Sequence, residues 1–137
     1  MTHEIRNPEE LAPARGFSHA VIAASGRTVY LGGQTAHGSD GVLLGVTIVE
    51  QFDRAAANVV TALAATGARP EDLVSLQIFV TDAEEYRSSL EPIGKSWRER
   101  LGRRYPAMAL FEVTGLFDPA AKVELVGIAV IPEETSG

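Results

Sequence analysis

The sequence predicts an α+β fold with the element order β-β-α-β-α-β-β, in which two helices cover one face of a four- or five-stranded sheet. Three observations lead to this class. Short apolar runs bounded by glycine, proline and polar residues are typical of strands. Apolar residues recur at three- and four-residue spacing over 49–63, which indicates an amphipathic helix. The length of 137 residues and a hydrophobic content of 45% suit one core, so we expect a single domain over residues 1–137.

The N-terminal part is expected to hold an extended arm followed by a β-hairpin. Residues 1–14 form the arm, and His3 lies in its frayed end. The apolar runs 18–24 and 28–33 are separated by Ser25-Gly26-Arg27, and this glycine-containing connection predicts that the two strands pair as a hairpin.

A loop and the first helix follow. Residues 35–45 are rich in glycine, serine and aspartate and have no apolar period, so they predict a loop. Thr47 and Glu50 fit a capping box, in which the threonine hydroxyl accepts from the Glu50 amide and the Glu50 carboxylate accepts from the Thr47 amide. We expect the helix to end at Gly67.

The next strand, 73–80, leads into a second helical region. Asp82 and Glu85 resemble another capping box. Pro92 is expected to split this region into a short turn and a longer piece ending near Gly102, because proline removes a backbone donor and clashes one turn back.

The last two strands, 105–113 and 121–130, complete the order. Several strands of this chain are apolar at both alternating sets of positions, which is typical of strands buried on both faces. Examples are Val21, Ile22, Leu125, Val126, Ile128 and Val130. Two helices cover only one face, so we expect another subunit to cover the second, through an apolar interface above roughly 2,000 Å².

Composition excludes several function classes. The chain has no cysteine, which excludes a disulfide framework, a thiol nucleophile and Cys-ligated zinc. Its three histidines do not stand at i, i+4 helical spacing, so we expect no metal. There is no apolar leader and no run approaching the roughly 18 apolar residues of a membrane span, so we expect a cytoplasmic protein without a membrane partner.

The net charge of −6 argues against a nucleic-acid partner, because affinity for a phosphate backbone comes mostly from Lys and Arg. One basic cluster, at the end of the second helical region, is an exception to the acidic composition. It comprises Arg98, Arg100, Arg103 and Arg104. Cations at this position complement the negative end of the helix dipole, and we interpret the cluster in that way.

Six blocks of the chain, taken together, carry a resemblance to a known family. They are Gly16–Val21, Leu31–Gln34, Gln51–Gly67, Ile78–Asp82, Pro106-Ala107 and Val123-Glu124-Leu125. In order and spacing these blocks resemble the Rid family (reactive intermediate or imine deaminases, also called YjgF), and the resemblance runs from about Arg15 to Val130.

The resemblance implies a chorismate-mutase-like fold assembled as a homotrimer, with small-molecule clefts between neighbouring subunits. It also implies a chemistry that needs no cofactor: hydrolysis of a 2-aminoacrylate-type enamine, or its imine, to a 2-keto acid and ammonia. In that chemistry an arginine clamps the substrate carboxylate, and a glutamate positions the attacking water.

Carried over by position, Glu124 matches the catalytic glutamate, whereas Met108 stands where the arginine is expected. Phe17 stands at a family tyrosine, Gly32 at a residue that is often serine, and Glu91 near a family asparagine. The pocket is therefore more apolar and lacks its anion clamp. A small carboxylate such as 2-aminoacrylate should bind poorly.

Further candidates come from the residues themselves, each beside a simpler interpretation. Glu124 is either an inward catalytic carboxylate or a solvated strand residue. Met108, Phe17 and Phe111 either pack in the core or line an adaptable apolar pocket. His19 is a general acid or base near the cleft, or an ordinary surface or core residue.

Two other groups of residues could act from the rim of the cleft. His37 could close over a ligand from its loop, or be an ordinary loop residue. Arg15, Arg103 or Arg104 could supply the missing cation from another direction.

Three functions remain open. The first is hydrolysis of an imine or enamine other than 2-aminoacrylate, bulkier and less anionic, with Glu124 orienting water. The second is a non-catalytic, regulatory trimer that binds a metabolite. The third is ribonuclease activity, which the acidic charge, the absence of an adjacent histidine pair and the lack of a metal motif disfavour.

Overall fold

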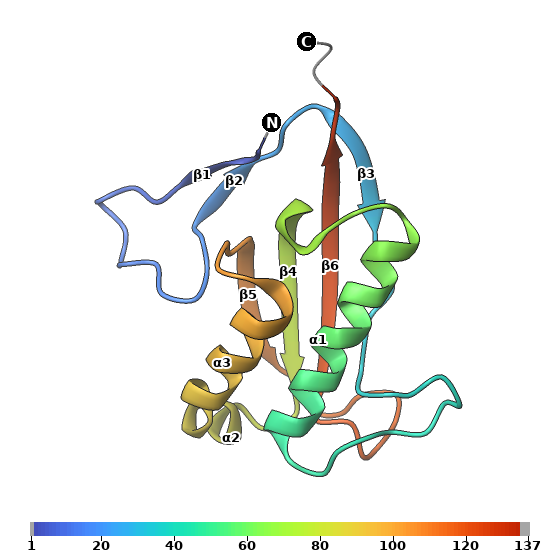
Figure 1. Cartoon of the computed structure of the whole chain (residues 1–137). Helices are drawn as coiled ribbons and strands as arrows, with labels where there is room; N and C mark the ends of the chain where they lie inside the picture. Colours follow the sequence, from blue (N-terminus) through green and yellow to red (C-terminus); the bar gives the residue numbers. More distant parts are fainter. Residues whose placement is uncertain (1, 135–137) are drawn as a thin grey trace.

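A four-stranded sheet packed against two helices forms the body of the chain (Figure 1). The computed structural model describes residues 2–134. The sheet order is β3 (Gly26–Tyr30), β6 (Val123–Pro132), β4 (Leu73–Val80) and β5 (Ala107–Glu112). β6 is antiparallel to both its neighbours, and β4 and β5 are parallel. This mixed arrangement confirms the α+β class.

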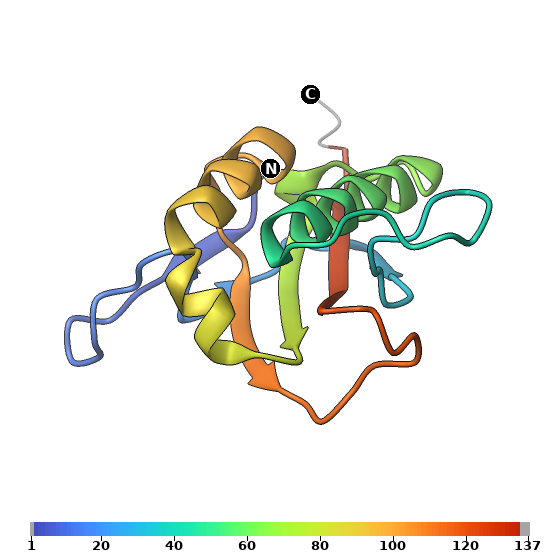
Figure 2. The same cartoon turned by 90° about the horizontal axis from the view of Figure 1, so that it is seen from below.

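The helices α1 (Ile48–Ala65) and α3 (Leu90–Leu101) lie on the same side of the sheet (Figure 2). Alternation along β6 buries Val123 and Leu125 beneath them, together with Leu76 of β4. Among the described residues, no helix combines the length and the hydropathy that a membrane span requires.

The local signals around α1 are confirmed. Glu50 N donates to Thr47 Oγ1 at 3.1 Å, and Thr47 N donates to Glu50 Oε1 at 3.0 Å, which completes the capping box. The helix ends at Ala65, and Gly67 follows with a φ of 84°. That left-handed conformation favours glycine and stops the helix.

Asp53 on α1 joins the two helices. Its carboxylate accepts from Ser96 Oγ at 2.5 Å and from Arg100 Nε and Nη2 at 3.1 and 2.9 Å. The hydrogen bonds from Arg100 are the main reason that the pKa of Asp53 lies below its usual value, with Ser96 adding to the effect.

The predicted hairpin of 18–24 with 28–33 is wrong. β2 (Ala20–Ile22) pairs with β1 (Glu4–Arg6), and β3 pairs with β6 instead. At Gly26, where β3 begins beside β6, a Cβ would lie 2.0 Å from the Ile131 carbonyl oxygen, so this close approach requires glycine. The predicted arm of residues 1–14 therefore contributes a strand.

The expected frayed position of His3 is also wrong. His3 is 3% exposed, its Nε2 donates to Val130 O at 2.9 Å, and its Nδ1 accepts from Ala24 N at 3.0 Å. The imidazole thus fastens β1 to the end of β6. Such a long-range polar contact has no signature in the local sequence.

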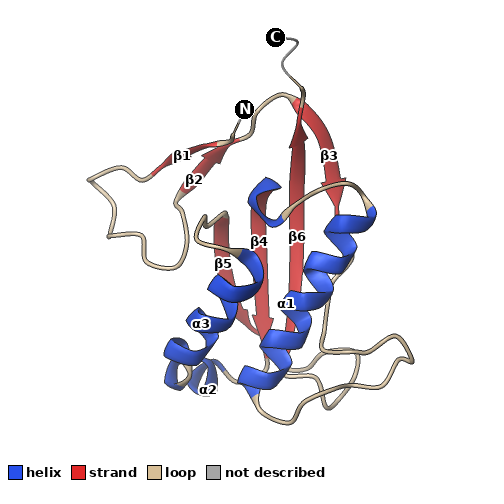
Figure 3. Cartoon of the chain, in the orientation of Figure 1, coloured by secondary structure: helices blue, strands red, loops and turns tan. Residues whose placement is uncertain are grey.

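Pro92 separates α2 (Ala83–Ser88) from α3, as predicted. It is the third residue of α3, where a backbone N–H has no acceptor within the helix. Gly102 follows α3 with a φ of 89°. The loop predicted over 35–45 is part of a long irregular connection, drawn in tan in Figure 3.

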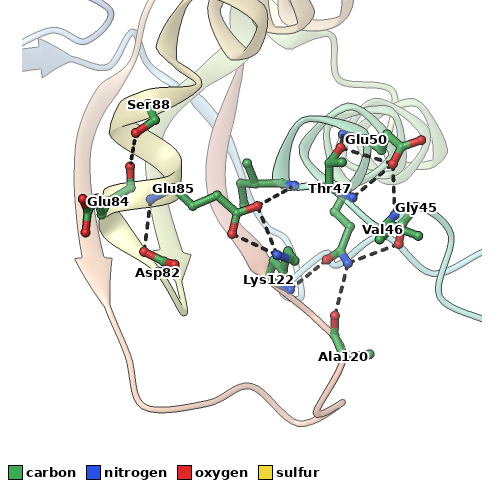
Figure 4. A network of polar contacts seen from close by, with 12 residues as sticks. Gly45, Val46, Thr47, Glu50, Asp82, Glu84, Glu85, Ser88, Ala120 and Lys122 are labelled. Atoms are coloured by element: carbon green, nitrogen blue, oxygen red, sulfur yellow. Dashed lines mark hydrogen bonds and ion pairs between the residues drawn. The ribbon is translucent and has the colours of Figure 1, made fainter.

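Only half of the second capping box is present. Asp82 accepts from Glu85 N at 3.0 Å, but the Glu85 carboxylate turns away from Asp82. It accepts from Lys122 Nζ at 2.9 and 3.0 Å and from Ile48 N at 3.3 Å (Figure 4). A lysine ammonium and a free amide at the start of α1 offer this carboxylate stronger partners than the Asp82 amide does.

The sheet face opposite the helices carries the second set of alternating side chains. By register these are Tyr30, Ser75, Gln77, Phe79, Ala107, Ala109, Phe111, Glu124, Val126 and Ile128. Tyr30 is 77% exposed and Phe111 44%. The two-sided apolar pattern of the sequence thus corresponds to an apolar face with no described helix on it, and its covering by another subunit stays a prediction.

Candidate functional site

A pocket of about 550 Å³ lies between α3, the free edge of β5 and the segment before β2. Most of its walls are apolar. The lining side chains include Phe17, Phe52, Leu90, Ile93, Trp97, Tyr105, Met108 and Leu110. We call this cavity the β5 pocket. Its size and composition suit a small molecule with an apolar body.

Ser18 fixes the wall that carries Phe17. Its amide donates to Pro106 O at 3.0 Å and its hydroxyl donates to Tyr105 O at 2.6 Å. Tyr105 in turn stacks on Trp97 of α3, with ring centroids 5.5 Å apart. The segment before β2 is therefore attached to the start of β5. This attachment places Phe17 and Met108 in the lining of the same pocket.

Two polar residues of the β5 pocket, Tyr86 and Arg98, were not singled out from the sequence for this role. Tyr86 of α2 lines it, and burial raises the pKa of its hydroxyl to about 12. That hydroxyl keeps its proton at neutral pH and can donate a hydrogen bond. Arg98 lines the pocket as well, and within residues 2–134 it has no ion pair.

The three arginines proposed to supply the missing cation lie in different parts of the structure. Arg15 lines the β5 pocket together with Arg98. Arg104 Nη2 donates to His3 O, and Arg103 is not among the residues that line the β5 pocket. The signal for Arg98 was Gly94 four residues earlier, because the missing side chain leaves room for a guanidinium: Arg98 Nη1 lies 3.3 Å from where a Gly94 Cβ would stand.

Three further candidates lie outside the β5 pocket. His19 Nε2 donates to Ala12 O at 2.7 Å, and its ring contacts Phe17 edge-on at 5.0 Å between centroids. This arrangement orders the loop before β2. Glu91 is exposed on the first turn of α3, and Gly32 is not among the residues that line the β5 pocket.

Glu124 lies on the open face of the sheet. Its cross-strand neighbour is Phe79, which stacks on Phe111 at 5.4 Å between centroids, so one row of side chains joins the carboxylate to the aromatic pair. A Cβ on Gly33 would lie 2.5 Å from Glu124 Oε1. The carboxylate thus rests against the bare backbone of Gly33, and it has no hydrogen-bonding partner among the described residues.

Met108 and Glu124 point to opposite faces of the sheet. Met108 pairs with the buried Leu76 on the helix side, whereas Glu124 pairs with Phe79 on the open side. Within one chain the sheet therefore separates the β5 pocket from the carboxylate. A site that uses both needs two copies of the chain.

A second, more polar pocket of about 540 Å³ lies beside α1 and holds His37. Its lining includes Gly33, Gln34, Thr35, Ser39, Arg54 and Asn58. The Thr35 hydroxyl contacts His37 Nδ1, and His37 Nε2 lies 2.9 Å from Asp118 Oδ2. No cluster of three or more metal-ligating side chains occurs within residues 2–134.

Comparison with known proteins gives a consistent picture. The family model described as endoribonuclease L-PSP matches residues 7–131. A protein of unknown function of the conserved Rid family from Yersinia pestis is 30% identical, with a TM-score of 0.86 over 96% of this chain and 100% of that one. A member of the YjgF/YER057c/UK114 family from Mycobacterium tuberculosis is 27% identical, with a TM-score of 0.64 over 95% and 100% of the two chains. No curated protein sequence matches the chain.

Proposed function

The chain belongs to the endoribonuclease L-PSP family, which includes the Rid (YjgF) proteins, and from this premise we propose that it is a homotrimeric hydrolase of an imine or enamine. The proposed site is the cleft between the β5 pocket of one subunit and Glu124 of the next. One observation carries the proposal: the sheet separates the apolar pocket from the carboxylate in a single chain, while each of them faces outward where a second copy could meet it.

In the proposed reaction Glu124 orients and deprotonates a water molecule that attacks the carbon of the C=N bond. The carboxylate then returns that proton to the nitrogen, which gives a carbinolamine. It next takes the proton of the carbinolamine hydroxyl and passes it to the nitrogen as the C–N bond breaks, so that ammonia leaves and the carbon becomes a carbonyl. General acid–base catalysis of this kind typically contributes about 10²–10⁴ in rate. The protonated Tyr86 hydroxyl is the pocket's own hydrogen-bond donor to the substrate.

The substrate proposed for this site is larger than 2-aminoacrylate. A pocket of about 550 Å³ walled by aromatic and aliphatic side chains is far from filled by a three-carbon acid. Met108 offers no charge to a carboxylate, so an anionic group on the substrate would be bound by Arg15 and Arg98. We therefore expect an imine or enamine with a bulky apolar group.

The test is ammonia release from a panel of imines generated in place from amino acids with small, branched and aromatic side chains. Wild type should release ammonia faster from the bulky imines, and Glu124→Gln should lose about 100-fold or more in rate. Glu99→Gln is the matched control, because Glu99 is an exposed residue of α3 that pairs with Lys95 at 4.0 Å. Equal rates for wild type and Glu124→Gln would reject the mechanism.

A non-catalytic, metabolite-binding trimer is the second candidate, and Met108 is the observation that favours it. Without the family arginine, the cleft could bind an apolar ligand and not turn it over. Thermal shifts with stable carbonyl compounds, without ammonia release from any imine, would support this alternative. Ribonuclease activity is the least consistent with the net charge of −6, and it predicts RNA cleavage that persists through stringent purification.

A further inference from the structure

The second pocket is lined by Thr35 and His37, and Asp118, which is not part of the lining, contacts His37. The proposed imine chemistry uses none of these three side chains. Thr35, His37 and Asp118 form a hydroxyl–imidazole–carboxylate series. His37 and Asp118 are sheltered, with 29% and 31% of their side chains exposed. They come from the two long loops that precede α1 and β6 (Figure 3).

The order of these contacts fixes the tautomer of His37. An ionised carboxylate only accepts hydrogen bonds, so Nε2 carries the proton that points to Asp118. In the neutral ring Nδ1 is then an acceptor, and the Thr35 hydroxyl donates to it. A backbone hydrogen bond from Ala120, followed by the one from His37, lowers the pKa of Asp118, so this carboxylate is ionised at neutral pH. A base oriented by a carboxylate and facing a hydroxyl is the arrangement that activates an oxygen nucleophile.

The same pocket holds a cation suited to stabilising an oxyanion. Arg54 of α1 lines it, and within residues 2–134 it has no ion pair. Its Nε is buried and finds no hydrogen-bond acceptor among the described residues. Asn58, one turn further along α1, donates to Thr35 O at 2.9 Å and to His37 O at 2.8 Å. The helix therefore places Arg54 on the side that meets the Thr35–His37 segment.

We propose that this pocket is a second reactive site, in which Thr35 is an acyl-accepting nucleophile, His37 its general base, Asp118 the residue that orients the base, and Arg54 the stabiliser of the oxyanion. The substrate class is a small carboxylic ester. None of these four residues takes part in the imine hydrolysis proposed above.

The chemistry is an ordinary acyl transfer. Thr35 Oγ1 attacks the ester carbonyl while its proton passes to His37 Nδ1, and the negative charge on the carbonyl oxygen faces Arg54. The C–O bond to the alcohol breaks, and the departing alkoxide takes the proton from His37. Water then cleaves the acyl-threonine with His37 again as base, which releases the acid and regenerates the hydroxyl.

The experiment uses p-nitrophenyl acetate and the full-length protein. Wild type should release p-nitrophenolate in a burst, and intact mass followed by peptide mapping should place an acetyl group on Thr35. His37→Gln should slow acylation by about 100-fold or more, because it removes the general base. Thr35→Ser should keep the reaction.

Two variants separate a specific reaction from nonspecific acetylation. Thr35→Val removes the hydroxyl at nearly constant shape and should abolish the labelled peptide. Thr61→Val is its matched control, because Thr61 lines the same pocket but its hydroxyl donates to Ala57 O at 3.1 Å. Acetyl groups mapped only to other residues of the wild type, or acylation unchanged in His37→Gln, would overturn the proposal. The mapping on the wild type decides the question even where a variant fails to fold.

Discussion

Replacing Met108 by arginine should give the protein part of the 2-aminoacrylate hydrolysis that the Rid resemblance implies. Met108 lines the β5 pocket at the position where the Rid resemblance places the substrate-binding arginine. A guanidinium there could bind a small carboxylate through two parallel hydrogen bonds. We therefore expect Met108→Arg to hydrolyse 2-aminoacrylate faster than wild type.

The size of the gain follows from two opposing effects. One charged hydrogen bond contributes about 1.5–3 kcal/mol, so a two-point clamp contributes about 3–6 kcal/mol before costs. The pocket is apolar and already holds Arg15 and Arg98, so desolvation and repulsion oppose the new charge. Taking these costs as about half, the net gain is about 1.5–3 kcal/mol, or roughly 10- to 150-fold in kcat/KM.

The assay is ammonia release from 2-aminoacrylate generated in place, with oligomeric state and thermal stability measured on the same samples. Met108→Leu is the control, because it conserves volume and apolar character and should leave kcat/KM unchanged. Met108→Lys should gain less than Met108→Arg, since an ammonium cannot bind both carboxylate oxygens in a planar fork. A folded Met108→Arg protein with the kcat/KM of wild type would refute the reasoning.

Three other predictions concern the supporting structure. Gly33→Ala should lower the rate of ammonia release severalfold, because a Cβ would displace the Glu124 carboxylate. The unfolding temperature should change little, because the three atoms nearest to that Cβ all belong to Glu124. Unchanged kinetics would contradict this prediction. Asp53→Asn should destabilise the protein by only about 1 kcal/mol in urea at pH 7, since the Arg100 side chain is 44% exposed and solvent screens the ion pair. The pKa of Asp53 is lowered in the folded state, so that difference should be full above about pH 4 and disappear as pH falls below the folded pKa. Gln51→Leu should lower the free energy of unfolding by about 2–4 kcal/mol in the same assay. The reason is that the Gln51 amide, which is 2% exposed, accepts from one backbone N–H and donates to two carbonyls. A loss below about 1 kcal/mol would show that these backbone groups find other partners.

Elements whose signals are local could be predicted from the sequence. Thr47 and Glu50 begin α1 because their side chains bond to backbone amides three residues away. Pro92 divides the second helical region for an equally local reason. Both effects need no knowledge of the rest of the chain.

Features that depend on tertiary contacts could not be predicted. β3 pairs with β6, where Gly26 approaches the Ile131 carbonyl, and so β2 pairs with β1 instead of β3. The buried His3 bonds to a carbonyl more than a hundred residues away. Glu85 leaves its capping position for Lys122, which only the fold brings near. In each case a distant partner prevails over the local preference.

The candidate site shows the same limit. Alternation within a strand indicates which of its residues share a face, but the register between strands decides which face that is. The sequence could therefore propose Glu124 and Met108 as functional residues without showing that β4 places them on opposite sides of the sheet. Arg98 was interpreted through the helix dipole, and its place in the pocket depends on how α3 lies against β5.

The separation of pocket and carboxylate by the sheet has a consequence for how the protein would behave at low concentration. If every working site takes one wall from each of two chains, the number of sites follows the associated fraction and not the total amount of protein. An isolated chain could be fully folded and still have no site. Specific activity should then fall on dilution below the dissociation constant of the assembly, and substrates that span the cleft should shift the equilibrium back toward association.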